Sequence, residues 1–423
     1  MRKFFIIVCL LISVYLPAQN GDSLDWDIDT IFDEPPPASP SEDAKAKTAV
    51  PAVNTPTVKK VIKQRGYTFG VSYGFSTGLA PGWQLLPWNS GWHGEDYYLD
   101  RGINLNGGFN IDAQISDVFR VISTFSFQIP GFSFNLGDLF FDYNFNDTVF
   151  FRGGKYNHSW GISPNYGFTN LLSRVPKEGF SGDSYIYKVD VPIGVGGIQA
   201  LALTRVNLNG GVIPKIEDFG LGGKYNLALR LADLDMGVYY KDNMPLRGFL
   251  SIKTTIGKTE VYNEWLGVID LQNSSELSGA VNLGFARDFL DKKFSLAGEL
   301  FFNTEGNAYW YRPGTTIQKS DISPFIEGLN IAINTTYRPW EKGNPRLFLQ
   351  FRYAPSQDSA YLVPGFRLTP WSNIDFSIAA PMALGSKDGY YYTHSATDDK
   401  GRHLPFSLVF LISMSGSVQS GHY

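Results

Sequence analysis

The chain has 423 residues, a formal net charge of −4 at pH 7 and one cysteine, Cys9. Only 18% of its residues are charged, whereas 44 glycines, 32 phenylalanines and 23 tyrosines are many for an ordinary globular protein. The lack of a basic excess argues against a nucleic-acid partner, and one cysteine excludes a disulfide framework. Glycine, aromatic residues and modest charge are typical of lipid-facing β-strands.

Residues 1–18 have the pattern of a secretory signal peptide. Arg2 and Lys3 precede an apolar run that reaches Leu16 and is followed by Pro17 and Ala18. This run is shorter than the roughly 20 residues that a membrane-spanning helix needs. We therefore expect export, cleavage near residue 18 and a mature chain without cysteine.

Residues 19–62 are rich in proline, alanine, serine and acidic residues. Such a composition predicts a disordered periplasmic leader. Between Trp26 and Phe32, apolar side chains alternate with aspartates. This stretch is either a peptide that docks on outer-membrane assembly machinery or a solvated tail.

From Gly66 onward, apolar and polar residues alternate with a period of two. In residues 103–116, isoleucine, leucine, glycine, phenylalanine and alanine occupy the odd positions, and mostly asparagine, aspartate, glutamine and serine occupy the even ones. Successive side chains of a strand face opposite sides, so one face is apolar and the other is wetted. Stretches of about 9 to 11 residues cross a bilayer as tilted strands. The fold class predicted for residues 63–423 is therefore all-β, a transmembrane antiparallel up-and-down β-barrel of about 18 strands (roughly 16–18).

The expected strands lie near residues 66–74, 102–115, 118–129, 132–145, 148–157, 183–192, 198–207, 219–231, 234–241, 246–256, 259–270, 276–286, 292–303, 326–337, 345–354, 360–369, 372–381 and 404–418. With a periplasmic N-terminus, the long connections 75–101, 158–182, 304–325 and 382–403 all fall on the outer side. The inner connections are short, as in known barrels of this kind. The sequence predicts an outer-membrane protein in a two-membrane envelope, in contact with its lipid.

One segment carries a specific resemblance. Phe151-Arg152-Gly153-Gly154-Lys155 is followed by Trp160-Gly161 and by Thr169-Asn170-Leu171-Leu172. This pattern resembles the bacterial outer-membrane porin superfamily, in particular substrate-selective porins and alginate-export-type barrels of 16 or 18 strands. The resemblance implies that the outer loop at 158–182 folds inward and narrows the pore. Its candidate constriction residues are His158, Trp160, Asn165, Tyr166 and Asn170.

Two further features bear on the resemblance. The acidic, proline-rich leader is similar to those of spirochaetal outer-membrane proteins. Most such barrels end on an aromatic residue that closes the last strand, whereas here Ser415 to Tyr423 follow the apolar stripe. This departure bears on the signal for assembly into the membrane and not on the barrel.

Charged residues at alternate positions are expected to line the lumen, where they set selectivity. One interpretation is that opposite charges pair along the wall and only keep it wetted. The other is that arginines, carboxylates and aromatic rings form a track for polar or sugar-like solutes. The candidates are Arg120, Arg152, Lys188, Lys224, Arg230, Lys253, Arg346, Arg352, Arg367, Asp112, Asp138, Asp142, Asp190, Glu260, Glu264, Glu299 and Asp375.

No catalytic constellation is apparent. The five histidines are scattered, and neither a Gly-x-Ser-x-Gly motif nor zinc-ligand spacing occurs. We expect no enzyme, no metal and no cofactor.

The leading hypothesis is a porin-like channel for passive or substrate-selective diffusion of small hydrophilic solutes. The alternatives are a surface-exposed adhesin or structural barrel that acts through its outer loops, and a transporter of hydrophobic, fatty-acid-type ligands. The solute, and whether the barrel is a monomer or a homo-oligomer such as a trimer, stay open.

Overall fold

The protein is described from a computed structural model, which places residues 66–156, 158, 160–166, 183–206, 215–242, 245–269, 271, 277–304, 327–340 and 344–422. The predicted signal peptide, the predicted leader and Asn170 lie outside these residues.

Strands make up most of the described chain. They are β1 (Gly66–Trp83), β2 (Tyr98–Ser116), β3 (Phe119–Ile129), β4 (Ser133–Phe145), β5 (Val149–Lys155), β6 (Asp183–Ile193), β7 (Gly196–Val206), β8 (Gly220–Ala228), β9 (Asp233–Lys241), β10 (Leu246–Ile256), β11 (Thr259–Ile269), β12 (Leu277–Phe289), β13 (Phe294–Asn303), β14 (Gly328–Tyr337), β15 (Arg346–Ala354), β16 (Ser359–Trp371), β17 (Ile374–Ala379), β18 (Met382–Gly385), β19 (Ala396–Thr397), β20 (His403–Leu404), β21 (Phe406–Ser407) and β22 (Val409–His422). The described residues also contain three short helices: η3 (Ile216–Asp218), η6 (Pro355–Gln357) and α3 (Tyr390–Thr393).

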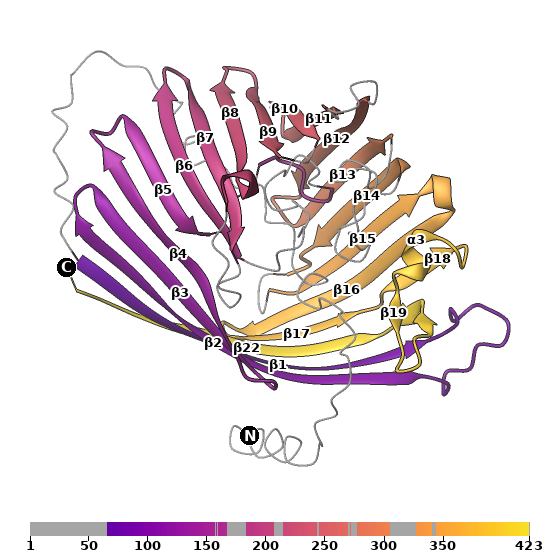
Figure 1. The fold of residues 1–423 in the computed structure, drawn as a ribbon. Coiled ribbons are helices and arrows are strands. Elements are labelled where there is room, and N and C mark those ends of the chain that lie inside the picture. The colour runs from indigo at the N-terminus through magenta and orange to yellow at the C-terminus, as the bar shows by residue number, and fades with distance from the viewer. Residues whose placement is uncertain are drawn as a thin grey trace.

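All the strands except β19 and β20 form one closed antiparallel barrel, and those two pair with each other (Figure 1). From β1 to β17 each strand pairs with the next along the chain, β17 pairs with β22, and β22 closes the circle on β1 from the pair Tyr67 and His422 to the pair Leu79 and Phe410. The short β18 continues β17 beside β16, and β21 continues β22 beside β1. The barrel therefore has 18 strands, which confirms the predicted fold class.

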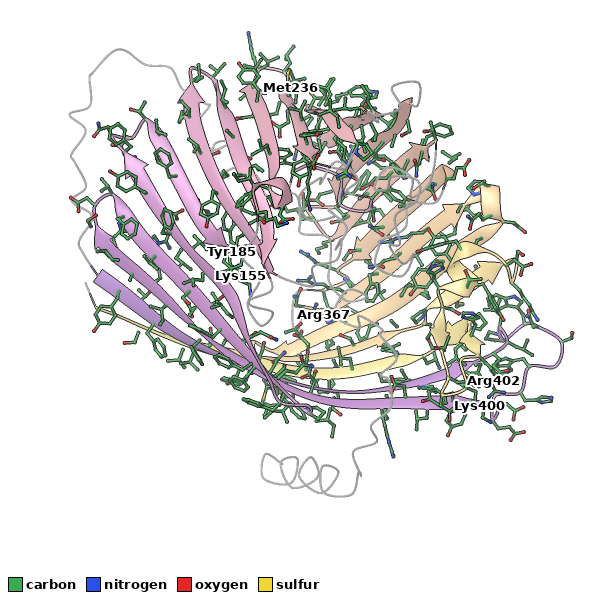
Figure 2. The ribbon with its side chains drawn as sticks, viewed as in Figure 1. Lys155, Tyr185, Met236, Arg367, Lys400 and Arg402 are labelled. Carbon is green, nitrogen blue, oxygen red and sulfur yellow. The ribbon has the colours of Figure 1, made fainter. Side chains whose placement is uncertain are left out.

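The two faces of the wall follow the alternation in the sequence. On β1, the side chains of Tyr67, Phe69 and Tyr73 point outward and are exposed. Thr68 and Ser72 alternate with them and point into the lumen. In Figure 2, Met236 lies on the outer surface and Arg367 lies on the inner side of the wall. The outward face thus offers lipid the apolar surface that a membrane barrel needs.

None of the helices in the described ranges has the length and apolar character to cross a membrane.

Short turns gather at one end of the barrel. Asn146 and Asp147 both have positive φ, at 52° and 54°, and Gly257 has φ 64°. Two-residue hairpin turns of the primed types need such values, which asparagine, aspartate and glycine adopt most easily. These turns join β4 to β5 and β10 to β11 at the end that the sequence assigned to the periplasm.

Several predicted boundaries are wrong, and three of them affect the connections or the lumen. Strand β1 runs to Trp83 because Leu79 and Pro81 still pair with β2, so the connection expected at 75–101 shortens to 84–97. Strand β22 continues to His422, where it pairs with β1, so the last strand ends later than expected. Strand β8 ends at Ala228, which leaves Arg230 exposed in the turn before β9 and not on the lumen wall.

The outward face can be tested with one charge. Leu283 lies in the middle of β12 and its side chain is outward and exposed. Because an arginine at the bilayer midplane costs about 2–4 kcal/mol, Leu283→Arg should lower the unfolding free energy by that amount in lipid vesicles. Ser126→Arg, on the inner face of β3, is the matched control and should leave the urea midpoint nearly unchanged. Equal losses in both variants would contradict the assignment of faces.

Candidate functional site

The chain leaves the barrel wall at the end of β5 and turns inward. At Gly154, φ is +138°, and a Cβ there would lie 2.2 Å from the carbonyl oxygen of Leu139. Only glycine fits this turn without strain. Two residues later Tyr156 is 4% exposed, and Trp160 is 1% exposed. Residues 158 and 160–166, here called the inner segment, therefore lie inside the barrel.

The carboxylate of Glu299 on β13 holds the inner segment. It accepts hydrogen bonds from Ser163 Oγ at 2.7 Å, from Asn165 N at 3.0 Å and from Asn165 Nδ2 at 2.9 Å. The backbone N–H of Tyr166 donates to the same carboxylate at 3.3 Å. Tyr262 on β11 donates to it from the wall at 2.8 Å. Glu299 is 2% exposed, so a buried charge is satisfied mainly by donors from the inner segment.

A second buried carboxylate lies beside the first. Glu264 on β11 is 0% exposed and accepts from the backbone N–H of Ile162 at 2.9 Å and from Ser251 Oγ at 3.1 Å. Asn282 on β12 donates to Ser163 Oγ at 2.8 Å and to Glu299 at 3.1 Å. The inner segment is therefore attached to consecutive strands of the wall.

Gln199 on β7 holds the start of the inner segment. Its Oε1 accepts from Trp160 Nε1 at 2.7 Å and lies 3.0 Å from His158 Nε2, while its Nε2 donates to Asp190 at 2.7 Å. Burial lowers the pKa of His158, and Lys188 lowers it further. A neutral His158 with its proton on Nε2 fits the acceptor that it faces.

Apolar packing fills the space between the inner segment and the wall. Trp160 packs on Phe249 with 5.6 Å between ring centroids, and Tyr166 stacks on Phe301 at 4.9 Å. Trp160, Phe249 and Phe301 belong to one buried cluster that includes Leu201 of β7 and Leu266 of β11, and Tyr166 packs against it. This side of the lumen is therefore closed by a core that is packed like a protein interior.

Opposite charges pair along the inner wall, both on the strands that hold the inner segment and on β2 to β5, β16 and β17. The pairs are Arg120 with Asp112, Arg152 with Asp142 at 2.6 Å, Lys188 with Asp190 at 2.8 Å, Lys224 with Asp235 at 3.1 Å, Lys253 with Glu260 at 2.8 Å, and Arg367 with Asp375 at 3.2 Å. These contacts match the first interpretation of the lumen charges. Because these side chains are part-exposed, each pair contributes little to stability and mainly balances charge.

The predicted site residues thus separate into groups. His158, Trp160, Asn165 and Tyr166 come together in the inner segment. Glu264 and Glu299 lie beneath that segment and not at a solvent-filled surface. The charged residues just paired lie along the inner wall, and Arg352 on β15 lies apart from them.

Sequence reasoning missed the uncharged partners of the inner segment. Gln199, Ser251, Tyr262 and Asn282 hold either the segment or the carboxylates beneath it. Each occupies a lumen-facing position of a predicted strand, so the alternation alone gives their face. It gives no sign of their partners, which lie about 10 to 120 residues away in the chain.

No protein-family model matches the chain, and no curated relative matches it. Solved structures do match in fold. OccK11 (OpdR) of Pseudomonas aeruginosa superposes with a TM-score of 0.52 at 8% identity, covering 84% of this chain and 96% of that one. OpdO of the same organism gives 0.52 at 10% identity, over 84% and 97% of the two chains. The outer membrane protein OpdK of that organism gives 0.50 at 8% identity, over 84% and 99%.

These likenesses span most of both chains, so the barrel matches as a whole and not in a fragment. At such low identity they establish the fold and nothing about the solute. The chain therefore shares the closed β-barrel fold of these proteins, which is the fold that the resemblance in its sequence implies.

The attachment by Glu299 can be tested by hydrogen exchange. Glu299→Gln removes the charge and replaces one acceptor oxygen with an amide donor that faces other donors. Because hydrogen bonds to charged groups contribute about 1.5–3 kcal/mol each, the amides of Asn165 and Tyr166 should exchange roughly tenfold or more faster. Glu260→Gln, which disturbs only the pair with Lys253, is the control. Unchanged exchange in the Glu299 variant would show that the packing alone holds the segment.

Proposed function

We propose that the chain is an outer-membrane channel of the porin type, which lets small hydrophilic solutes diffuse through a lumen narrowed by the inner segment. The observation that carries this proposal is the contrast between the two sides of the lumen. Glu264 and Glu299, on β11 and β13, are 0% and 2% exposed. On the other side, the side chains of Arg120 and Asp112 are 41% and 29% exposed.

The exposed pairs indicate a water-filled passage. Arg367 and Asp375, on β16 and β17, keep 31% and 20% of their side-chain surface exposed although both face inward. Charged side chains that keep this much exposed surface are hydrated, so water reaches them. The passage therefore runs along β1 to β4 and β15 to β17, beside the region that the inner segment fills, which leaves the pair Lys253 and Glu260 on β10 and β11 part-exposed.

The inner segment is suited to a fixed constriction. The buried carboxylates of Glu264 and Glu299 both accept hydrogen bonds from the inner segment. These bonds hold the segment in one position. Opening it would leave Glu299 and Glu264 without several donors, a cost of several kcal/mol by the usual penalty for unsatisfied charged groups. The segment should therefore set the pore size constantly and not act as a mobile lid.

The outward face supports placement in a bilayer. Its exposed side chains, such as Leu221, Val238, Leu300 and Phe302, are apolar on successive strands around the barrel. Lipid is the partner that this surface fits. The sequence also suggests two further partners: outer-membrane assembly machinery, on which the leader would dock, and further copies of the barrel in a homo-oligomer.

Conductance across a planar bilayer tests the channel. The purified, folded protein should carry an ion current, and the double variant Glu264→Gln/Glu299→Gln should carry a larger single-channel current because its inner segment is no longer held. Heat-modifiable migration on gels checks that the variant is folded.

The double variant Lys253→Gln/Glu260→Gln is the matched control, because it removes one exposed ion pair without touching the inner segment. Its current should be close to that of the unaltered protein. Absence of current in the unaltered protein and in both variants would contradict the channel and favour a sealed barrel used for surface display.

A further inference from the structure

Arg352 on β15 faces the lumen at the edge of the inner segment. The register places it opposite Ala332 of β14 on one side and Tyr361 of β16 on the other. Ala332 in turn lies opposite Glu299, so Arg352 is two strands from the carboxylate that holds Tyr166. At about 4.8 Å per strand, the two positions lie about 10 Å apart.

A second element, helix α3, lies at the start of β16, the strand that pairs with β15. Helix α3 is attached to the start of β16, because the backbone N–H of Tyr391 donates to Ser359 Oγ at 2.9 Å and that of Tyr390 to Gln357 Oε1 at 3.0 Å. Figure 1 shows α3 beside β16 and β18. Tyr391 stacks on Tyr361, with 5.9 Å between ring centroids and 18° between ring planes.

Three tyrosines lie near Arg352. Tyr361 is its neighbour across the β15–β16 pair, Tyr391 of α3 stacks on Tyr361, and Tyr166 of the inner segment lies within the electrostatic reach of the guanidinium. Burial raises the pKa of the Tyr391 and Tyr390 hydroxyls, and the charge of Arg352 opposes that rise in both. These phenols stay protonated and lie within the electrostatic reach of the guanidinium.

Arg352 differs from the paired cations of the lumen. The charged pairs on the wall each bring a carboxylate against an arginine or lysine. Among the described residues, no carboxylate lies within ion-pair distance of Arg352. Its five N–H donors can therefore be offered to a solute.

The passage beside Arg352 has a largely uncharged inner face. On β22, β1, β2 and β3 the lumen positions carry hydroxyl, amide and glycine groups in place of charges. They include Ser413, Ser415, Ser417, Thr68, Ser72, Asn106, Asn110, Thr124 and Ser126. The charged residues at lumen positions of these strands are Asp100 and the pair Asp112 and Arg120, so an ion meets few fixed partners along this face.

We propose that Arg352, with the rings of Tyr166, Tyr361 and Tyr391, forms a binding site for a neutral polyhydroxylated ring, that is, a sugar or cyclic polyol. Aromatic faces take the apolar C–H faces of such a ring, and the planar guanidinium donates to two adjacent hydroxyl groups. The proposal rests on the channel function and names its solute class.

A carboxylate is the competing ligand, because a guanidinium also binds carboxylates in a bidentate manner. Glu299 argues against it. Its buried carboxylate lies about 10 Å from Arg352 in a poorly solvated region, where its charge is weakly screened. It repels an anion and leaves a neutral ring unaffected.

Solute flux into proteoliposomes tests the site with three probes of similar size: glucose, gluconate and glucosamine. Glucose should enter fastest, and its rate should saturate with concentration. Tyr391→Leu should lower the glucose rate roughly three- to tenfold at low concentration, the range expected from losing one aromatic contact. Arg352→Gln should lower the rate of glucose entry, and gluconate should still not become the fastest of the three probes.

Tyr392→Leu is the matched control on the same helix, because its ring lies 5.8 Å from that of His403 and takes no part in the tyrosine group around Arg352. It should leave all three rates unchanged. Heat-modifiable migration confirms that each variant is folded.

Two results would contradict the sugar site but leave the proposed channel function intact. One is faster entry of gluconate, with that preference lost in Arg352→Gln, which would make this a carboxylate site. The other is entry ranked by size alone, with no effect of Tyr391→Leu. If none of the probes enters through any variant, the channel function itself fails, and the sugar site fails with it.

Discussion

The arrangement of the lumen depends on the hydrogen bonds between the Glu299 carboxylate and the inner segment. A charge this deeply buried is tolerated only with several donors, and the inner segment supplies most of them through Ser163, Asn165 and Tyr166. The segment in turn needs an acceptor for backbone groups that have left the sheet. Each therefore fixes the other. This mutual dependence explains how a chain that leaves the wall at Gly154 can stay at one place inside a wide barrel.

Fixing the segment divides the lumen into unlike halves. On the side of β7 to β13, apolar side chains such as Leu201 and Leu266 pack against Trp160 and Tyr166 and exclude water. Elsewhere on the wall, part-exposed charges are balanced in pairs, including Lys253 with Glu260 on β10 and β11, so the wall is polar without a strong net field. A channel built this way discriminates by size and by local contacts more than by the overall charge of the solute.

The sequence predicted what depends on local pattern. A period of two identifies most strands, and turn residues such as Asn146 and Asp147 set the inner connections. The sequence did not predict the extension of β1 to Trp83. Glycines and a proline follow Phe75, and such residues are typical of a turn. Here the pairing with β2 keeps them extended. The sequence also placed Glu299 in the lumen without its partners, since a contact with Ser163 spans 136 positions and leaves no local signal.

The central claim is that one side of the lumen is open to water and the other is filled. Modification of single cysteines during current recording tests it most directly, in a background with Cys9 replaced. A water-soluble thiol reagent should react quickly at Ser72→Cys and Ser126→Cys and reduce the current. It should not react at Ser251→Cys, whose position is 2% exposed beside Glu264. Equal reaction at all three positions, or a current unaffected at Ser72→Cys and Ser126→Cys, would contradict the account.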